Sequence, residues 1–289
     1  MSAIDTTFLR ASKEAIASPT NYPQSPLSQA LRQPVLLGLF LQIHHGGWSS
    51  SSLPRTTDWS FDYNAKLTKK AEELGFDLVF GYSTWQPKGG QGPIRTEAGL
   101  DAFISPRPLY GRPILVNATG SDTGIEFAGR HSDIVFITSP GGGDIESALS
   151  SLSAHTAHVK QSAIANGRQV RTFLNPLIVV RETEKEAEEY AQAIIDHADY
   201  QSIAGRSGVS SDAHAWRGHQ EGNLRHGVGS AIGGNVQLIG SPEQITKQLL
   251  QLNKAGVDGF QLAFYDFEPD LDFFGKRVLP LLKQVGLRL

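Results

Sequence analysis

The residues best suited to bind a ligand lie in a short turn, 117–124, between an apolar run and a helix-like stretch. Gly120 would allow the backbone to approach a ligand closely, and Ser121 offers a hydroxyl. Free N–H groups at the start of the next helix favour a phosphate. An ordinary turn with Ser121 or Asp122 as N-cap explains the same residues. The sequence alone favours this plainer interpretation, because small residues begin most such helices.

Other polar side chains follow further apolar runs. His44 and His45 could serve as acid–base groups at a strand end, although a pair of loop histidines without a role explains them somewhat better. The indoles of Trp48, Trp59 and Trp85 could wall a pocket for a flat ligand. Burial in the core is the default for such aromatics, and for Trp59 it is at least as good an explanation.

Several kinds of site are excluded or disfavoured. The chain has no cysteine, which removes disulfides, thiolate metal sites and a cysteine nucleophile. The histidines show no ligand spacing, so no metal site is expected. No Walker loop, G-x-S-x-G elbow or dinucleotide fingerprint is present. The second glycine-rich turn, 139–144, is a weaker anion site than the first and is better explained as a flexible turn.

The elements that must position these residues alternate between apolar strands and helices. Parallel strands are predicted at 35–42, 77–82, 113–117, 133–138, 173–180 and 259–264. Their near-continuous apolar character is typical of strands covered on both faces. Three of them are entered through an aspartate, Asp77, Asp133 or Asp258, which indicates a weakly repeated αβ unit. Short loops and repetition favour a (β/α) barrel over an open sheet.

Helix boundaries are marked by capping residues. Ser241 is a predicted N-cap, and Thr183 with Glu186 has the pattern of a capping box. Gly75 and Gly256 stand where helices are expected to stop.

Composition restricts the class of protein. The 289 residues carry 26 basic and 29 acidic side chains, a formal net charge of −3. So weak a balance gives no support for binding nucleic acid or a membrane surface. No apolar run reaches the roughly 18 residues of a membrane span, and 1–33 lacks an apolar signal core. We therefore expect a cytoplasmic protein.

Two domain-level expectations follow. Residues 1–33 should form a disordered or loosely packed arm, and 34–289 should form the barrel domain. Residues 82–111 and 200–235 interrupt the strand–helix rhythm. The polar, aperiodic segments 1–30 and 202–234 are predicted to be mobile.

Three stretches together resemble the luciferase-like flavin-dependent monooxygenases, in the branch of the dimethyl sulfone and alkanesulfonate monooxygenases, with pyrimidine-cleaving relatives nearby. They are "RTTDWSFDYNAKLTKKAEELGFDLVF", "GRPILVNATGSDTGIEFAGRHSDIVF" and "LIGSPEQITKQLLQLNKAGVDGFQLAFYDFEPDLDFFGKRVLPLL". The likeness extends over most of 34–287.

The resemblance implies a (β/α)8 barrel that uses reduced FMN and O2 on a small organosulfur substrate, a sulfone or an alkanesulfonate. A separate NAD(P)H:flavin reductase would supply the reduced flavin, and a homo-oligomer is common in the family. Carried over by position, Ser83 and Thr84 would lie against the flavin, and Gly120 with Ser121 would bind its phosphate.

The chain departs from the family between its second and fifth strands. Near 92–100 it passes almost directly to the segment before the fifth strand, so six strands are expected where the closed barrel has eight. The family's fourth-strand Asn, its flavin-contacting Glu and its Arg-Tyr pair have no counterparts.

Three functions stay open. The first is an FMN-dependent monooxygenase. The second is an inactive, internally truncated remnant that retains only binding of the flavin phosphate, and the missing segment favours it for the literal chain. The third is a protein that binds F420 or flavin without oxygenation.

Overall fold

The computed structural model describes residues 19–42, 49–58, 60–82, 109–201, 203, 225, 230–233 and 236–289. Its strands are β1 (Leu36–Gln42), β2 (Leu78–Tyr82), β3 (Val116–Ala118), β4 (Ile134–Ile137), β5 (Arg171–Leu174), β6 (Pro176–Val180), β7 (Val236–Gly240) and β8 (Gly259–Phe264). Its α-helices are α1 (Pro26–Ala30), α2 (Phe61–Glu73), α3 (Asp122–His131), α4 (Ile145–Ala165), α5 (Glu184–Asp196), α7 (Pro242–Lys254), α8 (Phe267–Phe273) and α9 (Leu279–Gln284).

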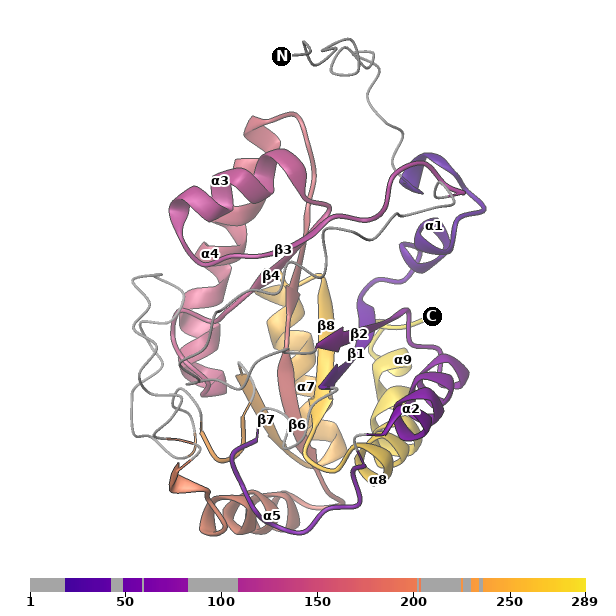
Figure 1. Ribbon diagram of the computed structural model, residues 1–289. Coiled ribbons are helices and arrows are strands. Elements are labelled where there is room, and N and C mark those ends of the chain that lie inside the picture. The colour runs from indigo at the N-terminus through magenta and orange to yellow at the C-terminus, as the bar shows by residue number, and fades with distance from the viewer. Residues whose placement is uncertain are drawn as a thin grey trace, which may run out of the picture.

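The strands form one curled parallel sheet. Six of them follow the order β2-β1-β8-β5-β4-β3, and β6 continues the sheet beside β8 and β7. All pairings between the described strands are parallel. Helices pack around the strands, with α3 and α4 on one flank and α2, α8 and α9 on the other (Figure 1). The expected incomplete (β/α) barrel with about six parallel strands is therefore confirmed.

Three details differ from the predicted strands. The strand predicted at 113–117 is limited to Val116–Ala118. The strand expected at 173–180 is interrupted at Asn175, whose side-chain Nδ2 donates to the Gln261 carbonyl at 2.6 Å. Strands β5 and β6 pair with β8 in the same register. The side-chain amide of Asn175 therefore replaces a backbone hydrogen bond of the ladder, and the chain after the break is not shifted along β8. Strand β7 was not predicted, because the helical signal that begins at Ser241 dominates its short apolar run.

Strands β2 and β3, at the ends of the path, are less covered than their sequences predicted. Val79 in β2 and Val116 in β3 are 38% and 46% exposed, and Leu115, just before β3, is 41% exposed. Among the described strands each of these two has a partner on one edge alone. The apolar character of these strands fits a sheet with further neighbours, which the described part of the chain does not provide.

Strand β2 nevertheless meets β4, the strand next to the other end of the path, through aromatic side chains. Phe40, Phe80, Phe136 and Phe173 come from β1, β2, β4 and β5. Successive ring centroids in this series lie 5.1, 5.5 and 6.1 Å apart. Because β2 and β4 are not neighbours in the sheet, the Phe80–Phe136 contact shows that the sheet curls back towards itself.

The helix boundaries follow the predicted caps. Capping boxes are present at Thr183 with Glu186 and at Ser241 with Gln244. Gly75 and Gly256 follow α2 and α7 with φ of 79° and 96°, a conformation that favours glycine over residues with a side chain.

The repeated aspartates share one arrangement at the amino ends of the strands. The carboxylates of Asp77, Asp133 and Asp258 each accept a backbone N–H from the neighbouring strand, at 2.8, 2.9 and 2.9 Å. Each aspartate also donates its own N–H, at 2.8 Å, to the carbonyl of the same neighbouring residue. We call this pair of bonds an aspartate clasp.

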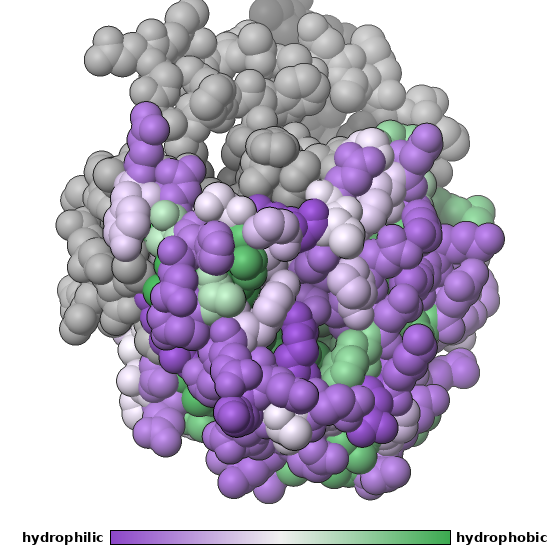
Figure 2. Space-filling view, turned by 90° about the horizontal axis from the view of Figure 1, so that it is seen from below, coloured by the Kyte–Doolittle hydropathy of each residue, from purple (hydrophilic) through white to green (hydrophobic). Residues whose placement is uncertain are grey.

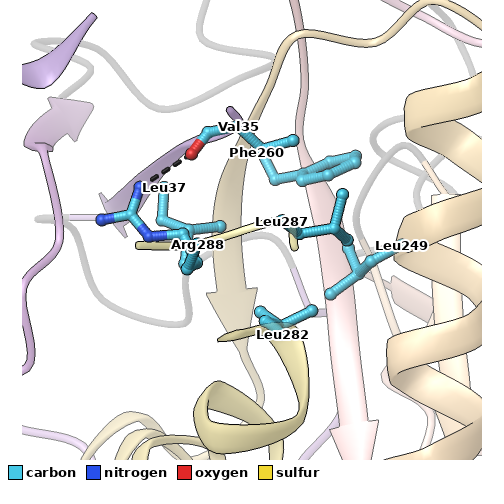
Figure 3. A pocket seen from close by; sticks show the side chains of 7 residues that line it. All are labelled: Val35, Leu37, Leu249, Phe260, Leu282, Leu287 and Arg288. Carbon is cyan, nitrogen blue, oxygen red and sulfur yellow. Dashed lines mark hydrogen bonds between the residues drawn. The ribbon is translucent and has the colours of Figure 1, made fainter. Parts of the chain in front are cut away.

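Each clasp has a cationic partner. Asp133 is bound by Arg112 at 2.5 and 2.6 Å, and Asp258 by Lys160 at 2.9 Å. The third pair is the most buried, with the side chains of Arg288 and Asp77 4% and 7% exposed. Figure 3 shows Arg288 donating to the carbonyl of Val35, at 2.7 Å, beside a lining of apolar side chains. The end of the chain is thus fastened to β1 and β2.

Part of the expected N-terminal arm contacts the barrel. Ala30 and Leu31 pack against the cluster of Leu36, Ile134 and Phe173. Residues 1–18 lie outside the described part of the chain, and most of 202–234 does as well. The mobility of both segments stays a prediction.

The surface is polar where the structure describes it on the face that bears α5 and α8. Hydrophilic residues dominate this view, and the hydrophobic ones form small separate patches (Figure 2). None of the helices in the described ranges is long and apolar enough to cross a membrane.

The buried clasp yields a stability prediction. Arg288→Met leaves the Asp77 carboxylate buried without its cation and should lower the free energy of unfolding by about 3–5 kcal/mol. Arg277→Met is the matched control, because its ion pair with Glu182 is about half exposed on both sides and should contribute about 0–1 kcal/mol. Urea unfolding of both variants measures the difference. Equal losses would contradict a special role for the clasp.

Candidate functional site

The turn before α3 has the geometry of a capped helix start. Ser121 is the N-cap, and its Oγ accepts the Gly124 N–H at 3.2 Å. The side chain is exposed to solvent. A serine hydroxyl has one donor hydrogen and two lone pairs, so the cap bond leaves the hydrogen free to donate. The plainer interpretation of Ser121 as N-cap is confirmed, and it leaves phosphate binding possible.

Glycine at 124 is required by the packing of this turn. A Cβ there would overlap the Thr119 side chain, which folds over the first turn of α3. Gly120 is absent from the described glycines with positive φ, so its backbone conformation does not demand glycine. Close approach of a ligand stays the explanation proposed for Gly120. The role of Gly124 was missed, because nothing in the sequence shows that Thr119 points back over the helix.

The two glycine-rich turns differ in the use of their own loop amides. In both, the first N–H groups of the following helix have no acceptor among the described hydrogen bonds: Asp122 and Thr123 in α3, and Ile145 and Glu146 in α4. At 139–144, the Gly141 N–H donates to Ser151 Oγ at 2.9 Å and the Gly142 N–H to the Ser139 carbonyl at 3.2 Å. The second turn thus uses its amides internally, which agrees with its lower ranking as an anion site.

The Arg-Thr-Thr segment crosses the carboxyl end of the sheet and is held by Asp266. Thr56 donates its N–H and hydroxyl to Asp266, both at 2.8 Å, and the Thr57 hydroxyl donates at 3.0 Å. The Arg55 guanidinium lies 4.6 Å from the centre of the Tyr265 ring. This network positions the segment that follows β1 against the end of β8. No pattern in the sequence indicated that these residues meet.

Next to Asp266 lies the carboxylate of Asp270, and the pKa of Asp270 is altered. Asp270 is buried, accepts the Asp266 N–H at 3.1 Å and pairs with Arg181 at 2.9 Å. Burial raises the pKa of Asp270 to about 6, and the nearby Arg181 opposes the rise. The same Arg181 stacks 3.8 Å from the centre of the Tyr190 ring, where burial raises the pKa of the phenol.

The other residues that the sequence suggested for a ligand site are not among those that the structure describes. Ser83, Thr84, His44, His45, Trp48, Trp59 and Trp85 lie outside the described residues. Within the described ranges, no three His, Asp or Glu side chains gather as a metal site would require. Of the ligand-binding candidates taken from the sequence, the one that the described structure supports is therefore the N-terminus of α3, which lies at the carboxyl end of the strands. Ligands of barrel enzymes bind at that end.

Comparison with known families fits this arrangement. The profile of the Luciferase-like monooxygenase family matches residues 89–259. The chain belongs to that family. The luciferase-like match includes β3, the turn at Ser121 and α3, and it confirms the resemblance drawn from the sequence.

Two curated luciferase-like relatives illustrate the branch. An FMNH2-dependent dimethylsulfone monooxygenase from Pseudomonas fluorescens (strain Pf0-1) is 29% identical over 187 residues, which cover 63% of this chain and 49% of the relative. A sulfoquinovose monooxygenase from Agrobacterium fabrum (strain C58 / ATCC 33970) is 32% identical over 197 residues, with coverages of 63% and 49%. The chain thus spans about half the length of these relatives.

Among solved structures, a long-chain alkane monooxygenase shares 22% identity over 61% of this chain and 42% of its own, with a TM-score of 0.49.

The raised pKa of Asp270 gives a pH prediction. Between about pH 4 and 6 the folded state holds more protons than the unfolded state, so this carboxyl makes stability fall as pH rises through that window. Asp270→Asn should remove this part of the slope. Asp272→Asn, which changes a more exposed carboxylate of the same helix, should leave it. Urea unfolding at pH 4.5 and 6.5 tests both variants, and an unchanged slope in Asp270→Asn would contradict the assignment.

Proposed function

We propose that this chain binds reduced FMN through its phosphate at the N-terminus of α3. We further propose that the chemistry of its class is oxygenation of a small organosulfur compound. The observation that supports the first part most directly is the combination of a family match over β3 and α3 with first-turn amides that have no described acceptor.

The phosphate end of FMN fits the residues present. The Ser121 hydroxyl would donate to one phosphate oxygen, and the N–H groups of Asp122 and Thr123 would donate to others. The partial positive charge at a helix N-terminus favours a dianion there. The Asp122 carboxylate would repel the phosphate and must turn away from it, which its exposure to solvent allows.

The remaining parts of the proposal rest on the relatives. Their names include FMNH2-dependent dimethylsulfone and sulfoquinovose monooxygenases, which support a sulfone or sulfonate as substrate. Reduced flavin would supply the electrons that activate O2, and a separate NAD(P)H:flavin reductase would supply the reduced flavin. Ser83 and Thr84 remain proposed contacts of the flavin ring, and a homo-oligomer remains proposed as well.

A second candidate, flavin binding without coupled oxygenation, is favoured by the open ends of the sheet. The described strand path stops at β2 and β3, and exposed apolar side chains lie on both. A reaction of O2 with reduced flavin needs a site from which water is excluded. On this argument the described part of the chain has the phosphate site with an incomplete wall around the ring.

The phosphate proposal is tested at Ser121. Ser121→Asp retains a good N-cap but places a carboxylate against the phosphate. FMN binding should weaken by more than the roughly 10- to 100-fold that losing one charge-assisted hydrogen bond produces in Ser121→Ala. Flavin fluorescence titration measures both variants. The matched control is Thr183→Ala, which removes the cap of α5 and should leave FMN affinity unchanged. Normal FMN affinity in Ser121→Asp would refute the proposed site.

The two candidate functions predict different products. With reduced FMN, O2 and an alkanesulfonate, we expect this chain to release mainly hydrogen peroxide and little sulfite. The reason is that a ring site open to water diverts the electrons to peroxide. Sulfite and peroxide are assayed in the same reaction. Sulfite formed in proportion to flavin oxidised would instead establish coupled oxygenation and exclude the second candidate.

A further inference from the structure

A cleft of about 700 Å³ lies at the amino ends of the strands, the end opposite to Ser121. Arg171 and Ile134 are the first residues of β5 and β4, and Asp258 immediately precedes β8. One wall comes from the segment around α1, through Thr20, Leu27 and Leu31. The other wall comes from α4 and the turn that follows it. In Figure 1, α1 and α4 stand on either side of β3 and β4. The volume is within the range of small-molecule sites.

The cleft carries more positive than negative charge. Its described lining contains four cations, Arg112, Lys160, Arg168 and Arg171, and two carboxylates, Asp133 and Asp258. Burial works to raise the pKa of Asp133, but the hydrogen bonds from Arg112 and Leu115 outweigh it and lower that pKa. The carboxylate therefore stays ionised at neutral pH.

Two of the four cations are not needed by the clasps. Asp77 and Asp258 are each satisfied by one cation, Arg288 and Lys160. Arg112 satisfies Asp133 in the same way through two bonds. The other two cations, Arg168 and Arg171, are thus in excess.

The excess cations have hydrogen-bonding capacity left over. Arg168 uses its Nη2, which donates to the Ser132 carbonyl at 3.0 Å and pairs with Asp133 at 3.5 Å, and its Nη1 has no hydrogen bond within the described part of the chain. The Arg171 guanidinium has no hydrogen bond or ion pair within the described part of the chain, although its backbone is fixed in β5. A guanidinium presents donors in a fork that matches the oxygens of a phosphate or sulfonate.

The rest of the lining is apolar. Leu27, Leu31, Ile114, Ile164 and Val170 surround the charged residues. A ligand that matches this lining has an anionic head for the two arginines and an apolar body for the aliphatic wall. Inorganic ions alone would leave that wall uncovered.

From this geometry we infer that the cleft is a second binding site, for a small organic oxyanion with a phosphate or sulfonate head on an apolar body. Arg168 and Arg171 bind the head. The site is separate from the α3 turn, because it opens at the other end of the same strands. It does not depend on the proposed flavin function.

The experiment uses the full chain in a Ser121→Asp background, which should weaken the binding of a phosphate at the proposed α3 site. Isothermal titration calorimetry measures the affinity of the chain for phenyl phosphate, for benzenesulfonate and for the neutral analogue phenol. Both anions should bind at least about tenfold more tightly than phenol, because one charge-assisted contact changes affinity by that order. The tighter anion shows which head the site prefers. Equal binding of phenol, or no binding of either anion, would overturn the inference.

Two variants locate the binding. Arg171→Gln should weaken the anions by about 10- to 100-fold, while Arg130→Gln, on the exposed face of α3, should not. Folding should survive in Arg171→Gln, because the side chain makes no described bond. Ile164→Glu provides a second variant: it adds a negative charge at an exposed position of the lining and should also weaken both anions. Unchanged affinity in both Arg171→Gln and Ile164→Glu would show that the anions bind elsewhere.

Discussion

The sheet depends on hydrogen bonds made by three aspartates at the amino ends of its strands. Asp133 binds β3 through its carboxylate and β5 through its carbonyl, which accepts the Arg171 N–H at 3.0 Å. Asp258 joins β5 to β1 in the same way, since its carbonyl accepts the Leu36 N–H at 3.1 Å. Asp77 joins β2 to β1. Together the three residues connect all six strands of the path in one continuous series.

This series explains why a sheet whose end strands lack a second described partner can have a defined curvature. In a closed barrel every strand is held on both edges, whereas here β2 and β3 have one described partner each. The aspartates fix the strand starts relative to one another, and the contact between the rings of Phe80 and Phe136 joins β2 to β4 across the curl of the sheet. The hydrogen bonds at the amino ends of the strands and the aromatic packing between β2 and β4 therefore contribute to the curvature that ring closure imposes in a complete barrel.

The sequence predicted the elements better than the site. Apolar runs and capping residues are local signals, and they located six strands and the starts of α5 and α7. The aspartate junctions were visible as a repeat, but their cations were not, because Arg288 meets Asp77 from 211 positions along the chain. Thr56 and Asp266 are 210 positions apart. Thr119 is close to Gly124 in the sequence, but the direction of its side chain depends on how the turn folds. Such contacts depend on the path of the chain in space and leave no local pattern.

Strand β8 lies in the middle of the sheet although it is the last strand of the chain. It pairs with β1 on one side and with β5 and β6 on the other. Arg288, further along the chain, donates a hydrogen bond to the Val35 carbonyl just before β1. Among the described strands, β1–β2, β3–β5 and β6–β7 are three separately paired groups that only β8 connects. Until residues 259–264 have left the ribosome, these groups have unpaired edges, and chaperones would have the most reason to bind the nascent chain in that period.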